Sequence, residues 1–167
     1  MEDFERLYRE YAIPVKKYVM TLCHNEALAD DVTAETFYKA LRSIDRLCPE
    51  TRVLTWLCAV AKNTYVDWTR KKEYQNLPLE EETLSFESTK GDPADECDAR
   101  QKNLELYRRI QELTNPYRDV IWLRVFAGLA FCEIADVMGK SENWARVTFY
   151  RGKNRLKERM TENETAL

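Results

Sequence analysis

Residues 128–157 read GLAFCEIADVMGKSENWARVTFYRGKNRLK, and this stretch decides the fold of the C-terminal part of the chain. Two short helical patterns flank residues 138–141, where Gly139 can adopt the left-handed backbone that ends a helix. Ser141 can then cap the second helix by accepting a backbone N–H bond. This arrangement is a helix-turn-helix signature, in which the second helix enters the major groove of DNA.

The second helix of this motif has one apolar and one basic face. Helical spacing predicts that the inward face is formed by Ala145, Phe149, Gly152 and Leu156. From residue 140 to residue 160 there are seven Lys or Arg residues and only two Glu residues. This density of positive charge favours binding to phosphates. The alternative interpretation is an ordinary helical hairpin with a solvated basic face.

Length and composition indicate an ordinary globular chain. Its 167 residues suffice for one domain or two small ones, and 44% of them are hydrophobic. No apolar run is long enough to span a bilayer, and the N-terminus is too charged for a signal peptide. We therefore expect a soluble cytoplasmic protein with no membrane insertion.

The reactive residue types give no support for catalysis or metal binding. Five cysteines are scattered without a C-x-x-C pair, and the chain has one histidine and four glycines. These residues build neither a recognisable zinc motif nor a phosphate-binding glycine loop. We expect reduced thiols, no metal site, no cofactor and no enzymatic activity.

The formal net charge of −3 is distributed unevenly along the chain. Residues 73–98 carry nine acidic side chains and one basic one, whereas residues 1–72 and 99–167 are net positive. Residues 74–98 also lose the helical period and contain two prolines and a glycine, which is typical of a linker. The sequence thus predicts an all-α fold, in which a flexible acidic linker joins two small helical domains, residues 1–73 and 99–167.

Three helices are expected in the N-terminal domain, at about residues 3–23, 27–44 and 54–73. Pro14 should kink or break the first of them, because it lacks a backbone donor. Phe37 and Leu41 are core candidates in the second. In the C-terminal domain, Asn115 is expected to cap a helix with Pro116 in its first turn.

This order of features resembles the extracytoplasmic-function (ECF) group of bacterial RNA polymerase sigma factors. Three stretches carry the resemblance, which covers nearly the whole chain. Residues 29–37, ADDVTAETF, look like the helix that binds the β′ clamp of the polymerase. Residues 55–72 look like the segment that binds the −10 promoter element, and residues 113–156 look like the −35 module.

The resemblance implies a role for individual residues. Core polymerase, through its β′ and β subunits, would be contacted by Asp30, Asp31, Glu35 and Phe37. The −10 DNA would be bound by Trp56, Lys62, Asn63, Arg70, Lys71 and Lys72. The −35 DNA would be bound by Asn143, Arg146, Val147, Thr148, Tyr150, Arg151 and Lys153. An anti-sigma factor is a further implied partner.

Three residues depart from the pattern of the family. Ala34 stands where glutamine is common, Trp144 replaces a small residue, and Gly152 occupies a position where alanine is usual. Two other functions are considered on the residues alone. A stand-alone helix-turn-helix regulator would bind duplex DNA without polymerase, and a helical adaptor would bind only protein. The ECF sigma factor is the preferred hypothesis, because it gives a role to the acidic residues of 27–44 and the basic, aromatic residues of 54–73.

Overall fold

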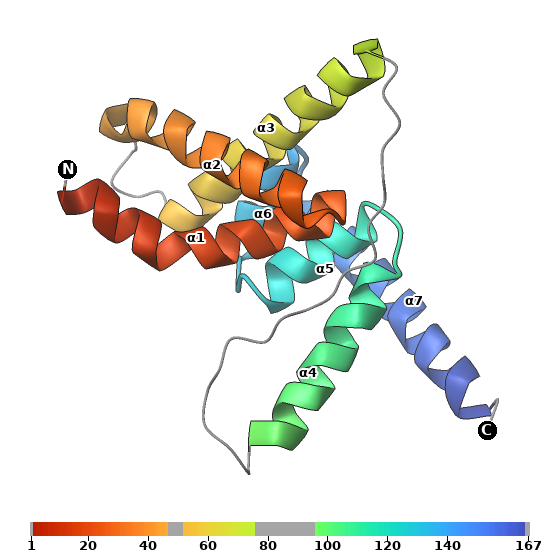
Figure 1. Cartoon of the computed structure of the whole chain (residues 1–167). Helices are drawn as coiled ribbons and strands as arrows, with labels where there is room; N and C mark the ends of the chain where they lie inside the picture. The colour runs from red at the N-terminus through yellow and green to blue at the C-terminus, as the bar shows by residue number, and fades with distance from the viewer. Residues whose placement is uncertain (1, 47–51, 76–95, 166–167) are drawn as a thin grey trace.

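The computed structural model describes residues 2–46, 52–75 and 96–165, and every element in this part of the chain is helical (Figure 1). The first three α-helices form what we call the N-terminal module: α1 (Glu2–Cys23), α2 (Glu26–Ser43) and α3 (Val53–Gln75), with a short 3₁₀ helix η1 (Ile44–Arg46) after α2. The C-terminal module comprises α4 (Glu96–Gln111), α5 (Tyr117–Val125), α6 (Phe131–Met138) and α7 (Glu142–Thr165). The predicted all-α class is confirmed.

The helices on either side of the predicted linker, residues 74–98, extend two or three residues into it. Helix α3 continues through Gln75 and α4 begins at Glu96. The rest of the expected linker, residues 76–95, lies outside the described residues.

Helices α1, α2 and α3 pack on one another through a set of apolar side chains. Val15, Tyr18, Val32 and Leu57 are almost completely buried. Leu41, expected in this core, is instead 47% exposed. Burial of these side chains removes apolar surface from water, at about 25 cal/mol for each Å².

Pro14 was expected to kink or break α1, and it does not break it. The helix is continuous from Glu2 to Cys23 with Pro14 inside it. Val15, Tyr18 and Val19 directly after the proline are all fully buried. Their packing offsets the roughly 3 kcal/mol that a proline costs inside a helix.

The turn between α1 and α2 is compact. His24 adopts a left-handed backbone (φ 53°), and its N–H donates to the carbonyl of Met20 at 3.0 Å. The side-chain oxygen of Asn25 then accepts from the N–H of Leu28 at 2.9 Å and caps α2. Two residues therefore reverse the chain and fix where α2 starts.

The helix-turn-helix has the predicted geometry. Gly139 ends α6 in the left-handed region (φ 64°), and the N–H of Lys140 donates to Ala135 at 3.0 Å. The hydroxyl of Ser141 accepts from the N–H of Trp144 at 3.1 Å and caps α7. Both local predictions for this turn are confirmed.

The start of α5 differs from its prediction. Pro116 occupies the capping position without a side-chain cap bond, and Tyr117 is the first helical residue. The prediction that Asn115 caps this helix is wrong. The first turn is instead held by backbone bonds from Arg118 to Thr114 and from Val120 to Pro116.

The two modules pack against each other, which the sequence did not predict. Helix α3 contacts α6, and α1 contacts α5. The rings of Tyr18 and Trp122 lie 5.5 Å apart across this contact, and both belong to one shared hydrophobic cluster. Figure 1 shows α5 and α6 against the N-terminal helices, while α4 and the far end of α7 project away.

Candidate nucleic-acid interface

The outer face of α7 is basic and aromatic. Most of the side chains predicted to bind −35 DNA are exposed on it: Asn143, Arg146, Val147, Tyr150, Arg151 and Lys153. Thr148 is the exception, because it is only 5% exposed. It lies on the same side of the helix as buried Ala145 and Gly152, at spacings of three and four residues. In this structure Thr148 therefore does not belong to the exposed face.

An aromatic cluster supports the beginning of this face. The ring of Phe131 lies 5.5 Å from that of Phe149 and 6.4 Å from that of Tyr150. The Arg146 guanidinium lies 5.5 Å from the centre of the Phe131 ring and also pairs with Glu142 at 2.9 Å. These contacts restrict the side chain of Arg146, so that less conformational entropy is lost when it binds a ligand.

Sequence reasoning missed Arg124, which belongs to the same cluster. Its guanidinium lies 4.6 Å from the centre of the Phe131 ring and donates to the carbonyl of Leu129 at 2.9 Å. Arg124 is exposed at the end of α5. Because it lies on a different helix from the basic row of α7, no periodic signal in the sequence indicated it.

The residues predicted to bind −10 DNA fall into two groups along α3. Asn63, Arg70 and Lys71 are exposed. Lys72 lies at the end of α3, with its ammonium 4.4 Å from the centre of the Trp68 ring. Trp56 and Lys62 are half-buried, and they lie on the part of α3 that packs against the C-terminal module. The structure therefore does not bring the six residues together on one open surface.

The acidic face of α2 is exposed at Asp30, Asp31 and Glu35. Asp30 pairs with Lys16 at 2.7 Å, and Glu35 pairs with Lys39 at 3.2 Å. Phe37 does not share this face, because it is 2% exposed and packs edge-on against Tyr8 at 4.8 Å. The prediction that Phe37 contacts a partner directly is not supported by its position, since it faces α1.

Two carboxylates of the C-terminal module meet polar side chains near and on α3. Glu133 accepts from the Thr55 hydroxyl and from the Arg52 guanidinium, each at 3.1 Å. It also accepts from the N–H of Ala130 at 2.7 Å and so caps α6. Asp119 accepts from the Lys62 ammonium at 3.3 Å. No pattern in the sequence predicted these pairs, which connect residues far apart in the chain.

Asp119 is an unusual group because it is a carboxylate that is only 1% exposed. Burial raises the pKa of Asp119, while the charges of Lys62 and Arg118 act in the opposite direction. Its Oδ1 atom has no hydrogen-bond partner among the described residues. Ionised Asp119 is thus only partly compensated in this position.

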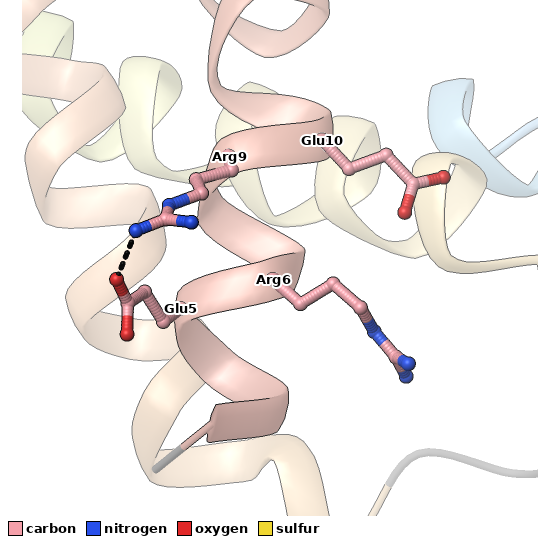
Figure 2. A pocket seen from close by; sticks show the side chains of 4 residues that line it. All are labelled: Glu5, Arg6, Arg9 and Glu10. Atoms are coloured by element: carbon pink, nitrogen blue, oxygen red, sulfur yellow. Dashed lines mark hydrogen bonds and ion pairs between the residues drawn. The ribbon is translucent and has the colours of Figure 1, made fainter.

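Other features of the described residues offer no catalytic arrangement. Figure 2 shows a hollow lined by Glu5, Arg6, Arg9 and Glu10, all from α1, in which Arg9 pairs with Glu5. No group of three or more His, Cys, Asp or Glu in this part of the chain could hold a metal ion. None of its helices is long and apolar enough to cross a membrane.

Three of the five cysteines have described side chains, and these are free thiols: Cys23, Cys58 and Cys132. Burial raises the pKa of Cys58 to about 12, so its thiol is inert at neutral pH. Cys48 and the side chain of Cys97 lie outside the described residues.

Comparison with known proteins accounts for both modules. Residues 7–74 match the family model Sigma-70 region 2, and residues 103–156 match Sigma-70, region 4. The chain belongs to the sigma-70 family of RNA polymerase sigma factors, in its ECF group. It is therefore a transcription initiation factor. The alternative hypothesis of a stand-alone helix-turn-helix regulator is not favoured, because it does not account for the match to region 2.

Relatives align over almost the whole length of the chain. The sigma factor CarQ of Myxococcus xanthus is 30% identical over 164 residues, covering 98% of this chain and 92% of CarQ. YlaC of Bacillus subtilis is 27% identical over 163 residues, covering 97% of this chain and 94% of YlaC. RpoE of Bartonella quintana, solved in complex with the anti-sigma factor NepR, shares the fold with a TM-score of 0.75. That match has 17% identity and covers 96% of this chain and 98% of RpoE.

Proposed function

We propose that this sigma factor places the exposed face of α7 in the major groove of the −35 promoter element. The observation that carries the proposal is the row of Arg146, Tyr150, Arg151 and Lys153, exposed on the second helix of a helix-turn-helix. Arg side chains bind phosphates and guanine edges, and aromatic side chains add apolar contact with bases. Arg124 extends the basic surface from α5 and is assigned to a DNA phosphate.

The −10 element is assigned to α3 and to the N-terminal domain, residues 1–73. Asn63 and Trp56 are proposed to hold bases of the opened strand, and Arg70, Lys71 and Lys72 its phosphates. Opening the duplex costs a few kcal/mol for each unstacked step. Stacking of bases on aromatic side chains contributes about 1–3 kcal/mol for each base and offsets that cost. The acidic segment 74–98 is proposed to link this domain to residues 99–167.

The binding of core polymerase is assigned to the acidic face of α2, and Asp31 is proposed to make the most direct contact. The support is charge and exposure, since Asp30 and Glu35 also lie on this face beside their lysine partners. We further propose that the chain acts in the cytoplasm, has no enzymatic activity of its own and is controlled by an anti-sigma factor. The complex of RpoE with NepR supports the last assignment.

The experiment is run-off transcription from a genomic promoter library with core RNA polymerase and purified variants of the full chain. Arg146→Ala with Arg151→Ala is expected to lower transcript yield at least tenfold, because each good base contact contributes about 1–3 kcal/mol. Arg108→Ala is the matched control, since Arg108 is an exposed basic residue of α4 outside the helix-turn-helix. Equal yields from both variants would remove the −35 assignment of α7.

A further inference from the structure

The ring of Phe131, the first residue of α6, lies beside two arginines that come from different helices. The guanidinium of Arg124 on α5 lies 4.6 Å from the ring centre, and that of Arg146 on α7 lies 5.5 Å from it. Both distances fall within the range of about 6 Å at which an aromatic ring attracts a guanidinium. One half-buried side chain therefore contacts two exposed cations of the C-terminal module.

The ring of Phe131 is held in place relative to α7. It lies 5.5 Å from the ring of Phe149 and 6.4 Å from that of Tyr150, and these two rings pack edge-on against each other at 5.4 Å. The start of α6 is fixed as well, because Glu133 accepts from the N–H of Ala130, directly before Phe131, at 2.7 Å. Phe131 is thus anchored through both its ring and its backbone.

Each of the two arginines is also held at a second point. Arg124 donates to the carbonyl of Leu129 at 2.9 Å, and Arg146 pairs with Glu142 at 2.9 Å. A guanidinium carries five N–H donors in one rigid plane, so a single bond of this kind leaves further donors for a ligand. The ring and the second contact together restrict the direction of that plane, whereas a solvated arginine samples many rotamers.

We propose that Phe131 is a positioning residue for −35 recognition, which holds Arg146 toward a base edge and Arg124 toward a neighbouring DNA phosphate. The inference rests on the proposed function, because it takes the exposed face of α7 as the reader of the −35 element. An arginine reads a base edge through two parallel hydrogen bonds, which require a correctly oriented guanidinium plane. A phosphate also attracts an arginine whose plane is free to rotate, because that attraction is mainly one of charge. Loss of the ring should therefore reduce discrimination between bases more than it reduces general affinity for DNA.

Substitutions at position 131 separate the aromatic face from the apolar bulk. Phe131→Leu keeps an apolar side chain beside Phe149 and removes the ring, whereas Phe131→Tyr keeps the ring. Phe131→Met, which fills the site flexibly without a ring, replaces Phe131→Leu if the leucine variant does not fold. Tyr117→Leu is the matched control, because Tyr117 is a half-buried ring of the same module whose guanidinium neighbour, Arg155 at 4.4 Å, is not assigned to DNA.

The first measurement is the NMR order parameter of the arginine Nε–H bonds in the full chain without DNA. Phe131→Leu should lower the values for Arg124 and Arg146, because both guanidinium groups lose the ring that restricts them. Phe131→Tyr should leave these values as they are in the wild type, and Tyr117→Leu should lower only the value for Arg155. Values for Arg124 and Arg146 that are unchanged in Phe131→Leu would overturn the proposal.

The second measurement is binding of the reconstituted holoenzyme to a promoter recovered by run-off selection and to every single-base substitution of its −35 element. Arg146→Ala should abolish discrimination at the position that Arg146 reads. Phe131→Leu should lower discrimination at that position by about two- to fivefold, the usual strength of an exposed cation–π contact, and should change binding to a scrambled −35 element by less than about twofold. In the Arg146→Ala background, Phe131→Leu should have no further effect there, because no side chain remains for the ring to hold.

Two results of the binding measurement would give Phe131 only a structural role and so overturn the proposal. One is an equal loss of binding to the selected and the scrambled −35 elements in Phe131→Leu, and the other is an equal effect of Phe131→Leu with and without Arg146. Failure of the proposed function itself looks different, because Arg146→Ala with Arg151→Ala would then change discrimination at no position of the −35 element. In that case this proposal fails with it, even if the order parameters change as expected.

Discussion

Gly152 of α7 packs against Ile121 and Tyr117 of α5, and its replacement by alanine is predicted to destabilise the protein. A Cβ atom at this position would lie 2.8 Å from Cδ1 of Ile121 and 3.1 Å from Cβ of Tyr117. Alanine gains about 1 kcal/mol over glycine in a helix interior. Overpacking in a well-packed core costs about 1–3 kcal/mol. The expected net loss is therefore about 1 kcal/mol, which lowers Tm by about 2–4 °C in a chain of this size.

A double-mutant cycle with Ile121→Val isolates the steric term. Valine lacks the Cδ1 atom, so Gly152→Ala in that background should lose the shortest contact and meet only Cβ of Tyr117 at 3.1 Å and Cγ1 of residue 121 at 3.3 Å. It should therefore recover part of the helix gain. The coupling between the two substitutions is expected to be about 1–2 kcal/mol, measured by thermal unfolding followed by circular dichroism. If Gly152→Ala alone raises Tm, or acts identically in both backgrounds, the argument from close packing is refuted.

Three further predictions concern charged groups. Burial raises the pKa of Asp119 above its ordinary value of 3.8, so that ionisation of this carboxyl lowers the stability of the folded chain as pH rises through the raised pKa. Asp119→Asn removes this cost. The variant should therefore increase Tm relative to wild type more at pH 8 than at pH 4. Asp31→Arg should weaken capture by core polymerase about tenfold, whereas Asp3→Arg on α1 should leave capture unchanged, as measured by co-purification. Arg124→Ala should weaken binding of the polymerase holoenzyme to its promoter and reduce the slope of log affinity against log salt by about 1, with Arg108→Ala as control.

Local signals in the sequence predicted the helix-turn-helix well. Gly139 and Ser141 act on neighbouring residues, so their roles follow from short-range backbone geometry. The inward positions of Ala145 and Leu156 follow from the helical period. These features are determined by residues within a few helical turns of one another, and they can therefore be predicted from a single sequence.

Predictions failed where packing between helices decided the outcome. Leu41 fits the helical stripe of α2, but none of the described helices covers it enough to bury it. Phe37 was predicted to have both a core and a binding role; its packing on Phe4 and Tyr8 of α1 confirms the core role, and the binding role stays a prediction. The bonds from Arg52, Thr55 and Lys62 to the C-terminal module cross 57 to 81 positions of sequence, a separation at which periodicity carries no information.

We infer that this chain directs core RNA polymerase to promoters through two DNA-binding modules. The decisive measurement is run-off transcription from a genomic promoter library, with core polymerase in the presence and absence of the wild-type chain. Discrete start sites are expected only when the chain is present, with two shared sequence elements upstream at a fixed spacing. If no start site depended on the chain, while the chain alone retarded duplex DNA, this role in transcription initiation would be wrong.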